Sequence, residues 1–158
     1  MGDVYLRNGQ TKFAEKCFER ANQLMEEESR HPIAGPAHAR ERATYLVDHD
    51  RELPLALKLA EKEFEIRADI YAYDLLAWAY FKNGKLAEAG KAIEMALASG
   101  TQDAKILFHS GMIKLEQGET REGLSHLKGA LQRNPNFSIL DVEVAREAIR
   151  KHEASSTQ

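Results

Sequence analysis

The sequence predicts an all-α protein, a right-handed superhelical solenoid of helical hairpins that ends in a C-terminal capping helix. Three observations support this fold class. A seven-position spacing recurs after 34 residues, a glycine falls at the same place in three of its copies, and an amphipathic segment follows the last copy. We expect a single domain over residues 1–151.

The spacing is clearest in the third and fourth copies. The third copy has Ala77, Tyr80, Gly84, Ala89, Ile93, Ala96 and Thr101 at these positions. The fourth copy has Gly111, Lys114, Gly118, Gly123, Leu127, Ala130 and Pro135. A fixed period of this length is typical of a repeat protein.

The small and turn residues in the spacing have a physical role. Small residues such as Gly111 and Gly123 allow two antiparallel helices to approach closely, and larger neighbours then fill the remaining gap. Gly84 and Gly118 can adopt a positive φ just past a helix end, where a tight turn between helices needs one. Each copy is therefore predicted to be a helical hairpin.

The first copy begins at the very start of the chain, with Gly2 already at the mid-helix small position. Its second helix is expected at about Thr11 to Ser29. Because a solenoid does not usually start with half a hairpin, we expect this chain to be the C-terminal fragment of a larger protein.

The second copy is weaker and allows two alignments. One alignment uses Ala43, Leu46, Asp50, Leu55, Leu59 and Lys62. The other shifts the second helix by one residue and brings Ala56 and Phe64 into register. An insertion separates this copy from the first, because Gly2 and Ala43 are seven residues further apart than one period. Residues 30–35 should form a loop, and Pro36 and Pro54 suit the first turns of the helices that follow them.

These residues resemble the tetratricopeptide repeat (TPR) over about residues 2–135. The strongest matches are Leu76-Ala77-x2-Tyr80 with Ala89-x3-Ile93-x2-Ala96, and Gly2-x2-Tyr5 with Ala14-x3-Phe18-x2-Ala21. Lys114 and Gly123 depart from the family pattern, which has Tyr and Ala there. The predicted repeats are 2–29 (truncated), 36–69, 70–103 and 104–137.

A capping helix is expected at about residues 139–151. Ser138 and Asp141 form a capping pair, and the spacing of Leu140, Val144 and Ala148 predicts the apolar face of this helix. Such a helix covers the apolar side of the last hairpin. Residues 152–158 should be a disordered tail.

The composition excludes several classes of function. A net charge of −3 and a pI near 6.1 argue against nucleic-acid binding. No apolar stretch is long enough for membrane insertion, and the lone Cys17 cannot form an internal disulfide. We therefore expect a cytoplasmic location, although a full-length protein could carry an upstream targeting segment.

The resemblance to the tetratricopeptide repeat implies a concave groove lined by the first helix of each hairpin. The groove positions of the family fall here on residues that include Thr44, Val47, Asp48 and Leu75. From them we select ten candidate partner-binding residues: Arg40, Glu41, Tyr71, Asp74, Trp78, Phe81, Lys105, Phe108, His109 and Met112. Exposed aromatic residues would supply affinity, and the charged residues would supply specificity.

Other interpretations of these residues stay open or are disfavoured. Trp78 and Phe108 could instead fill the core between adjacent helices. Some family members bind a chaperone's C-terminal carboxylate, but Thr44 and Leu75 stand where that site needs asparagine. The six histidines show no metal-ligand spacing, so neither a metal nor another cofactor is expected.

The sequence as a whole favours a non-catalytic module that binds a peptide or helix of a partner protein. It contains no paired carboxylates, metal cluster or phosphate loop, so we do not expect an enzyme. The alternative is a structural role, either as a homo-oligomer through the truncated first repeat or as a spacer in a larger protein.

Overall fold

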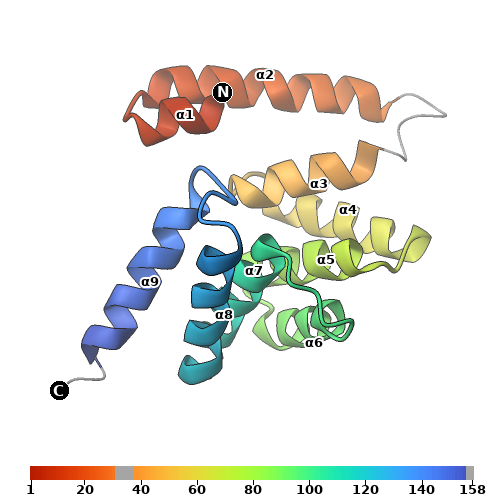
Figure 1. The fold of residues 1–158 in the computed structure, drawn as a ribbon. Coiled ribbons are helices and arrows are strands. Elements are labelled where there is room, and N and C mark those ends of the chain that lie inside the picture. The colour runs from red at the N-terminus through yellow and green to blue at the C-terminus, as the bar shows by residue number, and fades with distance from the viewer. Residues whose placement is uncertain (31–37, 156–158) are drawn as a thin grey trace.

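The hairpins form because short turns separate consecutive amphipathic helices. The computed structural model describes residues 1–30 and 38–155, and the regular structure in this part of the chain is all α-helical. The helices are α1 (Gly2–Arg7), α2 (Thr11–Ser29), α3 (Ala39–Asp48), α4 (Leu53–Ile66), α5 (Ile70–Lys82), α6 (Leu86–Leu97), α7 (Ala104–Glu116), α8 (Thr120–Arg133) and α9 (Asp141–Ser155). The predicted all-α solenoid is confirmed (Figure 1).

The turns within two of the hairpins have the predicted glycine conformation. Gly84 between α5 and α6 has φ +73°, and Gly118 between α7 and α8 has φ +84°. A side chain at either position would meet no neighbouring atom, so backbone strain rather than space favours glycine there.

The turn of the second hairpin differs from these two. It has positive φ at two non-glycine residues, Asp50 (φ +53°) and Glu52 (φ +39°), and holds one residue more before α4. As a result Ala56 and Ala60 are the buried small residues of α4, at 0% and 1% exposure. The one-residue shift left open by the sequence is therefore the correct alignment for this helix.

The curvature of the solenoid follows from which helices touch. The first helices of successive hairpins contact one another in the order α3, α5, α7, with α9 continuing the row. The backbones of the second helices α4, α6 and α8, all of them in the described residues, do not approach each other. The first helices therefore form the inner, concave layer (Figure 1).

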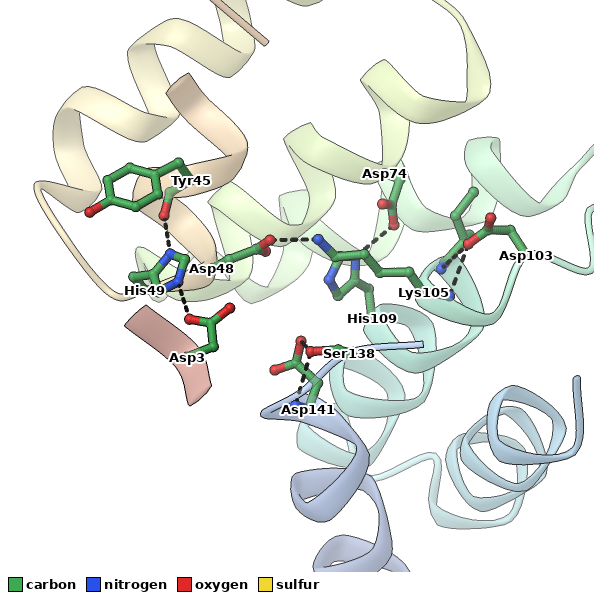
Figure 2. A network of polar contacts seen from close by, with 11 residues as sticks. Asp3, Tyr45, Asp48, His49, Asp74, Asp103, Lys105, His109, Ser138 and Asp141 are labelled. Atoms are coloured by element: carbon green, nitrogen blue, oxygen red, sulfur yellow. Dashed lines mark hydrogen bonds and ion pairs between the residues drawn. The ribbon is translucent and has the colours of Figure 1, made fainter. Parts of the chain in front are cut away.

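The α1–α2 hairpin is attached to this row through α3. The Tyr45 hydroxyl on α3 donates to the Phe18 carbonyl oxygen at 2.6 Å. His49 at the end of α3 lies 2.8 Å from the Asp3 carboxylate (Figure 2). Curvature also brings the first and last helices close to each other, because Arg7 of α1 and Arg146 of α9 line one cavity.

The last helix confirms one prediction and corrects two. Ser138 and Asp141 cap it as predicted, since the Asp141 N–H donates to Ser138 Oγ at 3.1 Å and that hydroxyl donates to the Asp141 carboxylate at 2.8 Å. The helix continues to Ser155, past the predicted end at Lys151, so residues 152–155 are not a disordered tail.

The predicted apolar face of α9 is right at Ala148, which packs against the core, and wrong at Val144. The buried residues are Val142, Ala145 and Ile149, whereas Val144 is 44% exposed. The helix is rotated relative to the sequence pattern because α7 and α8 both contact it. The predicted loop at 30–35, Pro36 and the last three residues of the tail lie mostly or wholly outside the described residues.

Candidate functional site

A cavity of about 230 Å³ opens on the concave layer, where α3, α5 and α7 lie in a row. Its lining residues come from all three helices: Arg40, Thr44, Val47 and Asp48 from α3, Tyr71, Asp74, Leu75 and Trp78 from α5, and Lys105 and His109 from α7. Several of these occupy equivalent places in successive repeats, such as Arg40 and Asp74, which are 34 residues apart. These side chains lie close together because they stand at equivalent positions of neighbouring repeats.

Arg40 is fixed on one side of the cavity by two carboxylates. Its Nε donates to Glu63 Oε1 at 2.9 Å, and its terminal nitrogen donates to Asp69 at 3.0 Å. Burial alone would lower the pKa of Arg40, but the hydrogen bond and charge of Asp69 and the charge of Glu63 outweigh burial and raise it. The guanidinium is thus held in one position by charges that neutralise it.

Asp69 is also the N-cap residue of α5. Its Oδ1 accepts the Ala72 N–H at 2.8 Å. Burial would raise the pKa of Asp69, but the hydrogen bond from Ala72 and the Arg40 guanidinium together lower it below the ordinary value. The beginning of α5 and the position of Arg40 therefore depend on one carboxylate.

Lys105 spans the cavity from α7 to α3. Its Nζ donates to Asp48 Oδ2 at 2.5 Å, a contact between residues 57 apart in the sequence. The start of α7 is set by Asp103, whose Oδ1 accepts the N–H groups of Lys105 and Ile106. Figure 2 shows the Lys105 side chain reaching from α7 to the Asp48 carboxylate.

His109 forms the floor of the cavity together with Asp74 and Trp78. The Nδ1 of His109 lies 2.8 Å from Asp74 Oδ1, and the ring stacks on Trp78 with centroids 4.2 Å apart at 15° (Figure 2). The side chain of His109 is only 3% exposed. Its Nε2 is buried and has no hydrogen-bond partner among the described residues. A buried nitrogen of this kind is an open position for a hydrogen bond.

The cavity brings together six of the ten candidate residues: Arg40, Tyr71, Asp74, Trp78, Lys105 and His109. Glu41, Phe81, Phe108 and Met112 do not line it. Within the set, Tyr71 is the most open aromatic residue, with 53% of its surface exposed. The partner-binding role of all ten stays a prediction.

The expectation that Trp78 and Phe108 face solvent is wrong. They are 4% and 1% exposed, and Phe108 packs against Phe137 with ring centroids 5.4 Å apart. Trp78 lies between Phe81, at 5.1 Å, and His109. The core role that the sequence left open for these two residues is the one they have, because the curved row of first helices closes over them.

Sequence reasoning missed the residues that position Arg40. Glu63 is 1% exposed and pairs with both Arg40 and Arg67. Two signals were available in the sequence. Glu63 and Arg67 have the i, i+4 spacing of a helical ion pair, and Asp69 directly precedes the apolar run of α5, as an N-cap residue does.

The described residues offer no group of three or more histidine, cysteine, aspartate or glutamate side chains that could hold a metal ion. In the same part of the chain, no helix combines the length and apolar character needed to cross a bilayer. The arrangement instead suits recognition, because it presents fixed charges and a partly exposed aromatic ring around a small cavity.

Comparison with known proteins supports the fold. A solved structure described as "Crystal structure of MamA" superposes with a TM-score of 0.59 at 16% sequence identity, over 95% of this chain and 97% of that chain. MamA contains tetratricopeptide repeats. No protein-family model matches the chain, and no curated protein matches it. At this identity the likeness concerns the fold, and the chain has a tetratricopeptide-like helical-repeat fold.

Proposed function

We propose that the chain is a tetratricopeptide-repeat protein that acts as a non-catalytic interaction module, binding a peptide or helix of a partner protein on its concave face. The observation that carries this proposal is the convergence of side chains from α3, α5 and α7 on one cavity. A rigid receptor surface loses little conformational entropy when a partner binds, so its pre-ordered side chains favour affinity.

The charged side chains of the cavity are held before any partner arrives. Arg40 has two carboxylate partners, and Lys105 has Asp48. Tyr71 is exposed beside them and offers an aromatic face to a partner. A few ordered polar groups around one aromatic anchor are typical of a peptide-binding surface.

The proposal is tested by site-specific photo-crosslinking in cells that express the whole chain. The photoreactive residue p-benzoylphenylalanine replaces Tyr71 in one variant and Met95 in a matched control. Tyr71 lines the cavity at 53% exposure, whereas Met95 lies on α6 at 51% exposure and does not line it. We expect a discrete crosslinked protein from position 71 only, identified by mass spectrometry.

The crosslink must also depend on the chemistry of the cavity. Changing Lys105→Gln or Asp74→Asn in the Tyr71 crosslinker variant should alter the yield, because these side chains border the same cavity. Equal labelling from positions 71 and 95, or none from either, would refute binding on the concave face.

A second candidate function is self-assembly through the first hairpin, favoured by its exposed apolar residues. Val4, Leu6, Phe13 and Leu24 are between 38% and 55% exposed. Leu24 also lines a cavity of about 580 Å³ between α2 and the end of α3. Exposed apolar side chains on one hairpin favour association when they form a common surface.

Sedimentation equilibrium over a wide concentration range tests self-assembly. A dimer through this hairpin should dissociate when Leu24→Glu is introduced. The matched control is Val144→Glu on α9, where the side chain is 44% exposed against 41% for Leu24. A wild-type chain that stays monomeric at every concentration excludes this candidate.

A further inference from the structure

We propose that the concave cavity takes the guanidinium group of an arginine side chain from the bound partner. This inference rests on the proposed function and states the chemistry of the partner's anchor residue. It follows from three features of the cavity: the balance of its charges, the open nitrogen of His109, and the position already occupied by Lys105.

The charges around the cavity leave one carboxylate without a cation. Arg40 and Arg67 share the carboxylates of Glu63 and Asp69. Lys105 is paired with Asp48. Asp74 has no lysine or arginine partner in the described residues and contacts only the His109 imidazole. With a neutral imidazole, the group carries an excess of one negative charge, which favours a basic ligand.

The hydrogen-bonding groups of the cavity also favour a basic ligand, because Asp74 and His109 offer acceptors. When the neutral His109 ring donates its Nδ1–H to Asp74, its Nε2 carries a lone pair and accepts. That nitrogen is buried and has no hydrogen-bond partner among the described residues, and the His109 side chain is only 3% exposed. The lining of the cavity therefore includes a carboxylate and a histidine whose second nitrogen lacks a donor.

Lys105 shows where a cation sits in this cavity. Its ammonium group reaches from α7 to the Asp48 carboxylate on α3 (Figure 2). The Lys105 side chain is 33% exposed and can move aside, which would release Asp48 to another cation. A guanidinium would then bond to the carboxylates through its several N–H groups while its plane packs on Tyr71.

The size of the cavity suits one side chain. Its volume of about 230 Å³ is below the roughly 300–1,000 Å³ of a pocket for a drug-sized ligand. This accommodates an arginine side chain but not the width of a helix, which is about 10 Å. The partner's backbone would therefore run across the opening, with one residue inserted.

The experiment measures binding of three capped pentapeptides with alanine at the outer positions and arginine, citrulline or glutamate at the centre. Citrulline has nearly the shape of arginine without its charge. Trp78 is the single tryptophan of the chain, so its indole N–H gives one NMR signal that reports directly on the cavity floor. We expect the arginine peptide to bind at least about tenfold more tightly than the other two at pH 8.

Two variants should change the affinity for the arginine peptide in opposite directions. Asp74→Asn removes the unpaired carboxylate and should weaken binding about tenfold. Lys105→Gln removes the competing cation and should tighten it. Glu94→Gln is the control, because Glu94 is exposed on α6 and does not line the cavity. Circular dichroism establishes that each variant is folded, and the comparison of the three peptides on the wild-type chain needs no variant.

Three outcomes would overturn the inference: tighter binding of the glutamate peptide, weaker arginine binding in Lys105→Gln, or no saturable shift with any peptide at millimolar concentration. The proposed function would still hold after any of these outcomes if the crosslinker at position 71 captures a partner and the crosslinker at position 95 does not. If that capture also fails, the concave face is not a binding surface.

Discussion

Gly111 on α7 and Gly123 on α8 lie backbone against backbone. A Cβ on Gly123 would be 2.9 Å from the Gly111 carbonyl oxygen, and a Cβ on Gly111 would be 3.0 Å from that of Gly123. Side chains crowd the same positions, because Leu127 would lie 2.6 Å from a Cβ on Gly111 and Leu115 would lie 2.9 Å from a Cβ on Gly123. The last hairpin therefore has no room for a side chain at either position.

Replacing Gly123→Ala should destabilise the fold by about 1–3 kcal/mol, the usual cost of overpacking a core. The measurement is the free energy of unfolding in urea. Gly129→Ala on the same helix is the control, because its nearest contact is Leu107 at 3.7 Å. That change should stabilise by about 0.5–1 kcal/mol through helix propensity. Equal effects of the two variants would contradict the close approach.

The N-cap of α7 should contribute measurably to stability. Asp103 accepts the N–H groups of Lys105 at 2.9 Å and Ile106 at 3.2 Å. Asp103→Ala should therefore cost about 1 kcal/mol. Gln10, at the N-cap of α2, makes no side-chain cap hydrogen bond, so Gln10→Ala serves as the control. Thermal unfolding followed by circular dichroism tests the pair, and a larger loss in the control would count against the cap.

Asp69 makes stability depend on pH in the acidic range. Its pKa is lowered below the ordinary 3.8, so its contribution is present above about pH 4 and is lost as pH falls through the lower folded value. Asp69→Asn keeps a cap residue but removes the charge facing Arg40. The stability difference between wild type and this variant should shrink as pH is lowered from neutrality to about 3.

The effect should be modest, because the Asp69 side chain is 44% exposed and solvent screens the pair. An NMR titration of the Asp69 carboxyl measures its pKa directly. In an Arg40→Gln background that pKa should move upward toward its ordinary value, since one of the groups that lowers it is gone. An unchanged titration would show that Arg40 does not stabilise the carboxylate.

The buried position of Trp78 predicts its fluorescence. With 4% exposure and the rings of Phe81 and His109 stacked on it, the indole should emit at short wavelength and resist quenching by iodide. N-acetyltryptophanamide, measured in the same buffer, is the reference for a fully exposed indole. A red-shifted and readily quenched emission from the native protein would contradict the packing described for the cavity floor.

Truncation of the neighbouring aromatic should have a structural effect. Phe108 is 1% exposed and contacts Trp78 and Phe137, so Phe108→Ala should cost about 3–5 kcal/mol of stability. Loss of partner binding in that variant would therefore report unfolding. Tyr71, which is exposed, is the position at which binding is separable from stability.

Local features of this protein were readable from its sequence. The turn glycines Gly84 and Gly118, the helix from Thr11 to Ser29 and the cap formed by Ser138 and Asp141 all follow from interactions within a few residues. Each depends on backbone conformation or on a hydrogen bond within one turn. Such properties are carried by short segments and do not require knowledge of the fold.

The sequence by itself determined the hairpins and the helices from which the concave layer is built. Only the tertiary structure decided which side chains of that layer are buried, because burial depends on how steeply the row of α3, α5 and α7 curves. The same curvature pairs Lys105 with Asp48 and sets His109 against Asp74. The first pair is separated by 57 residues of sequence and the second by 35. A pattern within a short segment cannot predict a contact between residues so far apart in the chain.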